Sequence, residues 1–399
     1  MNFDQMIDRR GTGAAKWDAR TKLFGRDDVI PMWVADMDFA APEPVLMALQ
    51  KQVEHGVFGY ALPSDELNEA IVKWMSQRHG WQIQSDWLIY VPGVVPALSL
   101  SVLSFSKPGE GVVIQPPVYY PFYDVVNRNN RKLFLNPLRL HNGRYSMDLD
   151  HLEAMLKKES NQIRLLILCS PHNPVGRVWT EEELRALGKL CSAYGVKVLS
   201  DEIHFDLVFP KYKHMPFGSI SEELAQQSIV FTAPSKTFNL AGLQLSYMIV
   251  PNPEWRETLK KETARLFLNP LNPINIAASK AAYEEGGSWL DALLAYLQDN
   301  AALARLRIEQ MLPNVQITEL QGTYLMWLDF RRCFESAQSL KRWAVHEAKV
   351  GFSEGKQFGK EGEGFVRMNI ACPRAMLQQA LDQMEKAAQA LEKCNVTEL

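Results

Sequence analysis

A single lysine follows directly after an apolar stretch of the sequence, in a setting that suits chemistry. Residues 229–232 predict a short buried strand that breaks at Pro234, and Ser235 and Lys236 come next, ahead of the apolar Phe238. We expect protein to surround much of the Lys236 amine, and burial disfavours the charged form of an amine. A neutral amine can attack a carbonyl and form a Schiff base. An ordinary loop lysine that reaches water fits this stretch equally well.

Three further polar residues could join this lysine at one site. Asp201 directly follows the predicted strand 196–200, and a carboxylate at the end of a buried strand needs a cationic or N–H partner. Asn173 lies earlier, in an Asn-Pro-x-Gly motif, and Arg367 lies near the C-terminus. A structural salt bridge would explain Asp201 taken alone. The combination of acid, amide, lysine and arginine indicates a shared active site.

A glycine turn near residue 93 could bind a phosphate. Residues 87–91 predict a strand, Pro92 and Gly93 a tight turn, and Val94 the start of a helix. This geometry directs free backbone N–H groups and the positive end of the helix at one point. Many turns between a strand and a helix carry a glycine, so the motif alone does not show that this turn binds a phosphate.

The elements that must position these residues alternate along the chain. We expect strands at residues 111–115, 132–136, 163–169, 196–200, 229–232 and 245–250, and helices near 119–129, 148–158 and 180–194. This alternation predicts an α/β fold with a mainly parallel, doubly wound sheet. Functional residues of such sheets gather at the carboxyl ends of the strands. The three polar motifs at 170–174, 200–204 and 235–236 all follow predicted strands.

The pattern changes in the last third of the chain, which predicts a second, smaller α+β domain. We expect helices at 274–285, 288–311 and 336–349, strands at 323–329 and 365–370, and a closing helix from residue 373. We predict three parts: residues 1–45, an N-terminal arm that belongs to the small domain; residues 46–285, the large domain; and residues 286–399, the small domain. The aromatic and charged residues of the arm indicate that it covers another part of the protein, or they serve only the packing of its own loops.

Composition excludes several classes of protein. The chain has 399 residues, of which 47% are hydrophobic and 22% charged, and its net charge is −3. No basic block is present, so nucleic acid and anionic membranes are poor partners. We see no secretory signal and no apolar run near the roughly 18 residues that span a bilayer. Five scattered cysteines are typical of reduced thiols. We therefore expect a cytoplasmic enzyme.

Taken together and in this order, the motifs closely resemble the fold-type I pyridoxal 5'-phosphate enzymes of the class I/II aminotransferase superfamily. Several segments are similar to its cystathionine β-lyase (carbon–sulfur lyase) branch. These segments are Arg9-Arg-Gly-Thr, Lys16-Trp-Asp, residues 33–39, Gly59-Tyr60, residues 117–122, residues 170–177 and residues 235–242.

The resemblance implies a role for each residue around the cofactor ring. Lys236 would hold pyridoxal phosphate as a Schiff base and then act as the base that moves the substrate Cα proton. Asp201 would pair with the ring nitrogen and keep it protonated. Asn173 and His204 would donate to the phenolic oxygen of the ring. Tyr119 would stack on the ring face, and we expect it to be catalytic together with Lys236 and Asp201.

The resemblance also implies how the phosphate is held. Its ligands would be the backbone amides of Gly93, Val94 and Val95, the Ser235 hydroxyl and, across a homodimer interface, Tyr60 of the other subunit.

The chain departs from the family at two positions near the phosphate. Relatives often carry a phosphate-binding serine and an arginine where this chain has Ala233 and Gln244. The phosphate would then be held with less positive charge, and Thr232 could compensate.

The substrate implied by the resemblance is an amino acid. Arg367 would grip its α-carboxylate in a two-pronged pair, with Asn173 and Tyr119 beside it. The leading hypothesis is β-elimination on cystathionine, cystine or other S-substituted cysteines, which yields a thiol, pyruvate and ammonia. An aminotransferase shares the early steps, and a regulatory protein that binds pyridoxal phosphate is a further alternative.

Overall fold

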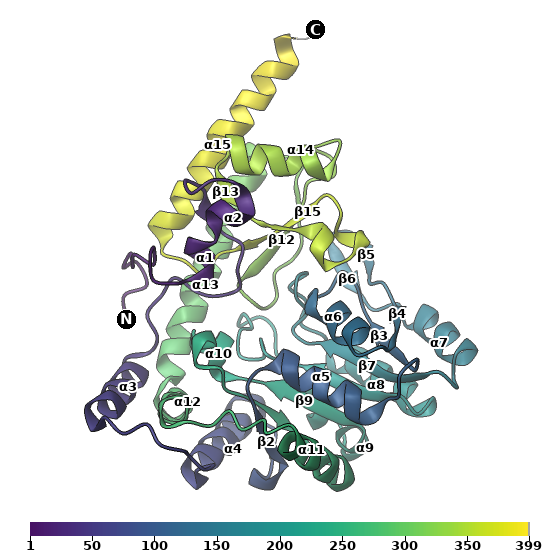
Figure 1. Ribbon diagram of the computed structural model, residues 1–399. Coiled ribbons are helices and arrows are strands. Elements are labelled where there is room, and N and C mark those ends of the chain that lie inside the picture. Colours follow the sequence, from purple (N-terminus) through teal and green to yellow (C-terminus); the bar gives the residue numbers. More distant parts are fainter. Residues whose placement is uncertain (398–399) are drawn as a thin grey trace.

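A computed structural model describes residues 1–397, and it describes side chains as far as residue 390. Figure 1 shows two sheet-containing parts, one above the other, with the closing helix α15 (Arg374–Thr397) projecting at the top. The described cysteines Cys169, Cys191, Cys333 and Cys372 are free thiols, as expected. The fifth, Cys394, lies outside the described side chains.

The lower part is built on a seven-stranded sheet with the order β2-β10-β9-β8-β7-β3-β4. Its strands are β2 (Leu88–Val91), β3 (Gly111–Ile114), β4 (Lys132–Leu135), β7 (Ile163–Cys169), β8 (Lys197–Asp201), β9 (Ser228–Thr232) and β10 (Ser246–Ile249). Only β10 runs antiparallel to its neighbours; the other pairs are parallel. The predicted α/β class is confirmed, because almost every central-strand residue is buried, as a sheet covered on both faces requires.

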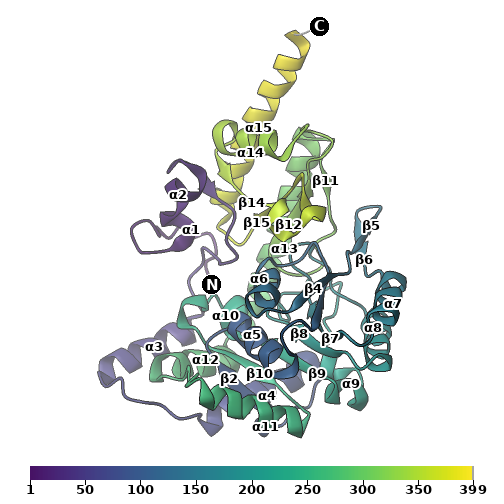
Figure 2. The same cartoon turned by 45° about the vertical axis from the view of Figure 1, so that its right-hand side comes forward.

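Helices cover both faces of this sheet (Figure 2). They are α5 (Val94–Phe105), α6 (Pro121–Arg128), α7 (Leu149–Lys158), α8 (Glu181–Ala193), α9 (Glu222–Gln226) and α11 (Pro253–Arg265), with a small hairpin of β5 (Arg139–His141) and β6 (Arg144–Ser146). The predicted capping box at Thr180 and Glu183 starts α8. Helix α12 (Pro273–Glu285) packs against α3 (Glu43–His55) and α4 (Asp65–His79).

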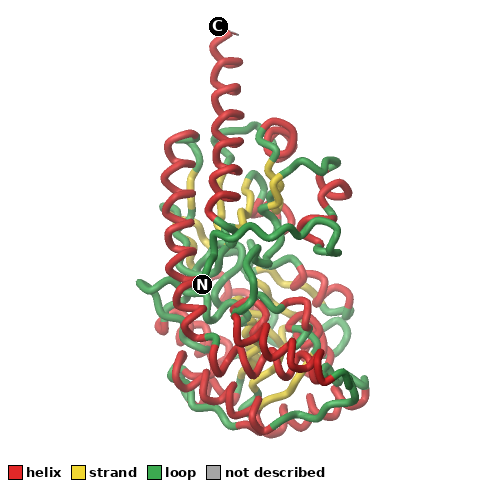
Figure 3. Tube along the Cα trace, turned by 90° about the vertical axis from the view of Figure 1, so that its left-hand side faces the viewer, coloured by secondary structure: helices red, strands yellow, loops and turns green. Residues whose placement is uncertain are grey.

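The upper part contains a four-stranded antiparallel sheet of β11 (Gln316–Ile317), β12 (Leu325–Asp329), β15 (Phe365–Asn369) and β14 (Ser353–Glu354). Helix α13 (Gly287–Met311) packs against α15, whose end extends beyond the rest of the molecule in Figure 3. The helix predicted over 336–349 is divided: α14 (Ala337–Arg342) passes into a π-helical turn, Trp343–Glu347.

The N-terminal arm is more regular than expected and touches the upper part. It contains two short helices, α1 (Ala15–Asp18) and α2 (Arg20–Phe24). Its strand β1 (Ile30–Pro31) pairs in parallel with β13 (Val350–Gly351). The domain limits at 45/46 and 285/286 stay predictions, as does the cytoplasmic location. None of the helices within residues 1–397 has the length and apolar character to cross a membrane.

Candidate active site

Two adjoining cavities gather the residues expected at the site. The inner one, of about 230 Å³, is lined by residues from the ends of β2, β7, β8 and β9. The outer one, of about 800 Å³, holds Arg367, and both cavities share Tyr119 and Lys236. Nine of the expected residues line the inner cavity, namely Gly93, Val94, Val95, Tyr119, Asn173, Asp201, His204, Ser235 and Lys236. Because parallel strands end at one edge of the sheet, segments distant in sequence meet there.

Lys236 lies in a one-turn helix, α10 (Pro234–Thr237), where the sequence suggested a polar turn after the strand. Pro234 occupies the first helical position, where its missing N–H costs nothing. The Lys236 amine donates a 2.5 Å hydrogen bond to the Ala35 carbonyl. Burial lowers the pKa of Lys236 to about 8, against the opposing effect of the carboxylates of Asp36 and Asp201. The amine therefore lies at the site, as a Schiff-base lysine requires, and not at the outer surface, where an ordinary loop lysine would reach water.

A buried carboxylate anchors α10 from behind. Asp206 accepts hydrogen bonds from the Thr237 hydroxyl at 2.7 Å, the Trp74 indole N–H at 3.0 Å and His79 Nε2 at 2.8 Å. Because Thr237 is the next residue after Lys236, these three contacts fix the backbone that carries the lysine.

Asp201 ends β8 and lies on the wall of the inner cavity. It accepts a 3.1 Å hydrogen bond from the Ile203 N–H. Burial raises the pKa of Asp201 to about 7, and the nearby Glu202 raises it further, whereas Lys236 opposes the rise. A cation bound in the cavity would therefore favour the ionised carboxylate.

His204 and Tyr119 leave polar atoms available to a bound molecule. The Nδ1 atom of buried His204 makes no hydrogen bond to any residue that the structure describes. Burial holds the pKa of His204 well below its ordinary value, so the ring is neutral. Burial raises the pKa of Tyr119 far above its ordinary value, so its hydroxyl keeps its proton.

Arg367 is buried in β15, at the boundary between the two sheets. Its Nη1 donates to Asn173 Oδ1 at 2.9 Å, and its Nη2 donates to the Trp33 carbonyl at 3.0 Å and to the Ser353 hydroxyl at 3.2 Å. Its Nε makes no hydrogen bond within the described part of the chain. Burial lowers the pKa of Arg367 to about 10, yet the guanidinium remains charged at neutral pH.

The expected phosphate site has few charges. Gly93 precedes α5, and residues at the start of this helix line the inner cavity together with Ser235 and Gln244. Thr232 does not line the cavity, and its hydroxyl lies 3.3 Å from the Glu202 carbonyl, to which it donates. Thr232 is therefore not placed to compensate for the missing arginine, and phosphate binding by the backbone amides at the helix start stays a prediction.

Tyr60 stands apart from the other expected residues. It is fully exposed, in a segment without regular structure, and lines neither cavity. A single chain does not test its expected place in a partner's site.

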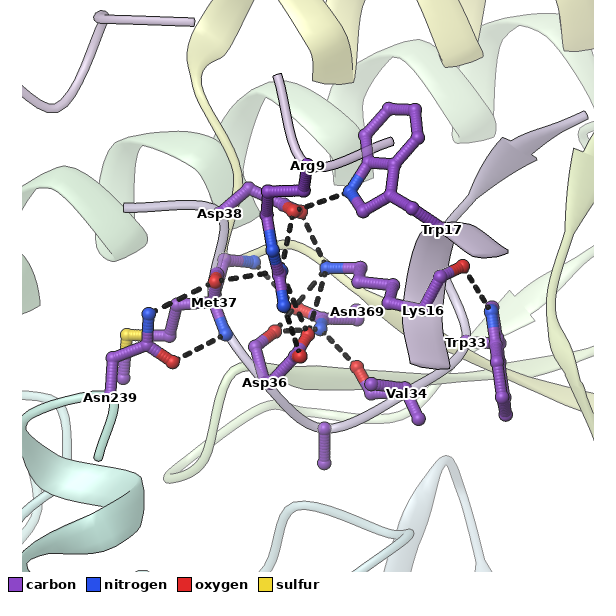
Figure 4. A network of polar contacts seen from close by, with 12 residues as sticks. Arg9, Lys16, Trp17, Trp33, Val34, Asp36, Met37, Asp38, Asn239 and Asn369 are labelled. Atoms are coloured by element: carbon purple, nitrogen blue, oxygen red, sulfur yellow. Dashed lines mark hydrogen bonds and ion pairs between the residues drawn. The ribbon is translucent and has the colours of Figure 1, made fainter. Parts of the chain in front are cut away.

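Sequence analysis named residues 33–39 only as part of the family resemblance and gave no site role to Ala35, Asp36 or Tyr324, which the structure places at the lysine. The Tyr324 hydroxyl donates to the Ala35 carbonyl at 2.9 Å, beside the bond from Lys236. Figure 4 shows the segment around Asp36 held by Arg9 and Lys16 of the arm. The arm's charged and aromatic residues were the available signal, and the structure favours the reading in which the arm covers another part of the protein.

These groups fit pyridoxal phosphate. The Lys236 amine suits an aldehyde, the Asp201 carboxyl suits a basic ring nitrogen, and the helix start at Gly93 suits a phosphate. His204 Nδ1, which has no partner in the described part of the chain, would offer the ring a further polar contact.

Comparison with known proteins identifies the family. Residues 27–384 match the family model "Aminotransferase class I and II". The chain is 44% identical to cystathionine beta-lyase PatB of Bacillus subtilis (strain 168), over 97% of this chain and 100% of that protein. Crystal structures of similar fold include cystalysin from Treponema denticola, which contains pyridoxal 5'-phosphate (TM-score 0.94, 38% identity, 98% and 99% coverage), and the pyridoxal-phosphate-bound C–S lyase from Staphylococcus hominis (TM-score 0.89, 33% identity, 97% and 98% coverage). The chain belongs to the class I and II aminotransferase family of pyridoxal-phosphate-dependent enzymes.

Proposed function

We propose that this protein is a pyridoxal-phosphate-dependent carbon–sulfur β-lyase that acts on S-substituted cysteines such as cystathionine or cystine. The observation that carries the proposal is the pair of cavities that share Lys236: one is lined by Asp201 and the helix start at Gly93, the other by Arg367. The names of the similar proteins, a cystathionine beta-lyase and a C–S lyase, support the same reaction.

Each residue has one task in this proposal. When bound, pyridoxal phosphate supplies a ring that withdraws electrons from the substrate Cα. Arg367 and Asn173 bind the α-carboxylate and orient the Cα–H bond toward Lys236. The neutral Lys236 amine takes the Cα proton, the electron pair forms the Cα–Cβ double bond, and the thiolate leaves from Cβ. Asp201 would hold the ring nitrogen in its protonated form, and Tyr119 would lie against the ring.

The outer cavity suits a large sulfur substituent. Its wall includes the apolar side chains of Leu23 and Phe24 from α2 and of Phe352, which directly precedes β14, as well as polar Gln357. At about 800 Å³ it exceeds what the cysteine portion of a substrate requires. After the thiolate has left, the remaining part of the substrate is released as an enamine, which hydrolyses to pyruvate and ammonia.

We propose that the protein works as a homodimer. Exposed apolar side chains cluster in the segment that carries Tyr60, including Val57, Phe58 and Leu62. An exposed apolar group of this kind is typical of an interaction surface. In the dimer, Tyr60 would reach the phosphate site of the partner.

The test is an assay of the purified protein with cystathionine, in which pyruvate and free thiol are measured with and without an added keto acid. A lyase forms both products without the keto acid. Turnover that requires the keto acid would instead identify an aminotransferase, and bound cofactor without any turnover would indicate a regulatory protein. Lys236→Ala should abolish turnover and the visible absorbance of the lysine–cofactor bond, whereas Lys189→Ala on the exposed face of α8 should change neither.

A further inference from the structure

Residues 33–39 of the N-terminal arm, here called the strap, reach the active site, where Ala35 contacts Lys236. Figure 4 shows the polar contacts that hold the strap around Asp36 and Asp38. Its far side is held by the upper sheet: Asn369 donates to the carbonyls of Val34 at 2.5 Å and Asp36 at 2.7 Å. Its near side is held by Asn239, which accepts from the Met37 N–H at 3.1 Å and donates to the same residue's carbonyl at 3.0 Å. The strap therefore lies between the two parts of the molecule.

Two cations of the arm hold the carboxylates of the strap. Arg9 lies 2.6 Å from Asp36 and 2.8 Å from Asp38. Lys16, whose side chain is only 1% exposed, lies 2.5 Å from Asp38, and the Trp17 indole N–H donates to the same carboxylate at 2.9 Å. Burial alone would raise the pKa of Asp38, but Lys16, Trp17 and Arg9 together hold it below its ordinary value. Asp38 thus stays ionised, and the strap is tied to the arm by charge.

The strap delivers one backbone carbonyl to the lysine. Ala35 precedes Asp36, and its carbonyl accepts from both the Lys236 amine at 2.5 Å and the Tyr324 hydroxyl at 2.9 Å. A neutral amine that donates one N–H to a fixed acceptor has its lone pair turned away from that acceptor. The position of the Ala35 carbonyl therefore restricts the lone pair of the free amine to the two remaining tetrahedral directions around Nζ.

We propose that Arg9 and Lys16 are positioning residues for the proton transfer at Lys236: through Asp36 and Asp38 they hold the strap so that the Ala35 carbonyl orients the free lysine amine toward the substrate Cα. The proposal rests on the proposed role of Lys236 as the base. Neither cation lines either cavity, so neither touches the reacting atoms. A shift of about 1 Å at a reacting group can cost on the order of 100-fold in rate.

The experiment measures proton transfer without any elimination. The holoenzyme is given L-alanine, which has no leaving group, in D₂O, and NMR follows the exchange of its Cα proton. Arg9→Leu should slow the exchange at saturating alanine by about tenfold or more, while the dissociation constant for alanine, read from the cofactor absorbance, changes less than threefold. Arg9→Lys, which can still pair with one carboxylate, should recover part of the rate.

Arg10→Gln is the matched control, because Arg10 is the next residue, is exposed and, among the side chains described, pairs with Asp8 alone, which lies outside the strap. It should exchange like the unaltered enzyme. An exchange rate of Arg9→Leu within twofold of the control would overturn the proposal. So would a loss of alanine affinity or of bound cofactor as large as the loss in exchange rate. If Arg9→Leu does not fold, Asp36→Asn carries the same expectation and the same refuting outcomes. Lyase activity plays no part in the result, so failure here is distinct from failure of the proposed function.

Discussion

The buried carboxylate behind the lysine helix supports a quantitative prediction. In Asp206→Leu, the indole N–H of Trp74 and the Nε2–H of His79 lose their shared acceptor, Asp206 Oδ1. The Thr237 hydroxyl can rotate to another acceptor, but the two ring donors cannot. A buried donor left without a partner costs about 1–3 kcal/mol, so the two cost about 2–6 kcal/mol in the free energy of unfolding.

Asp206→Asn separates lost hydrogen bonding from lost packing. The amide oxygen can still accept from both rings, and the amide nitrogen can donate to the Thr237 hydroxyl, so we expect a loss of about 1 kcal/mol. The control is Asp291→Leu, which breaks an exposed pair with Arg78 and should cost less than about 1 kcal/mol.

The assay is urea unfolding of the holoenzyme, followed by tryptophan fluorescence and circular dichroism. The midpoints should fall in the order unaltered protein, Asp291→Leu and Asp206→Asn close together, and Asp206→Leu well below. If Asp206→Leu unfolds at the same urea concentration as the Asp291 control, the three contacts do not stabilise the fold, and the reasoning is refuted.

Three further predictions concern the site itself. Arg367→Lys keeps the charge but loses the planar two-pronged geometry, so KM for the amino acid should rise about tenfold in steady-state kinetics; an unchanged KM would contradict the carboxylate role. In the cofactor-free protein, acylation of Lys236, mapped by mass spectrometry, should rise with pH through about 8, because burial lowers its pKa and only the neutral amine reacts; a rise only near pH 10 would contradict this. Mixing subunits with Tyr60→Ala and Lys236→Ala should recover about one quarter of the unaltered activity, because half of the dimers are mixed and each has one intact site. No recovery on mixing would show that Tyr60 does not act across an interface.

Much of the fold could be predicted because hydrophobic periodicity marks buried strands and amphipathic helices. The strand that carries Asp201 and the one before Lys236 lie within a residue or two of their expected limits. The split at Trp343 was not predictable, because a π-helical turn has no distinct pattern of apolar residues.

The residues of the site likewise include some that the sequence could predict and some that it could not. Lys236, Asp201, Asn173 and Arg367 could be found because their side chains are of the types that the proposed chemistry needs, and the structure brings all four to the two cavities. Ala35 could not be found from the sequence, because its contribution is a backbone carbonyl, which every residue has. Tyr324 reads as an aromatic residue of a buried strand, and only its hydroxyl contact distinguishes it.

Asn369 and Asp36, which hold the strap together, are 333 residues apart in the chain. A ribosome that adds about 5–20 residues per second needs roughly 20–70 s to reach Asn369 after it has added Asp36. Throughout that time the arm, with Trp17 and Trp33, has been synthesised but lacks the upper sheet against which it folds. The nascent chain therefore cannot complete its catalytic centre until synthesis is nearly finished, and a chain that stops before β15 would carry Lys236 without the means to orient it.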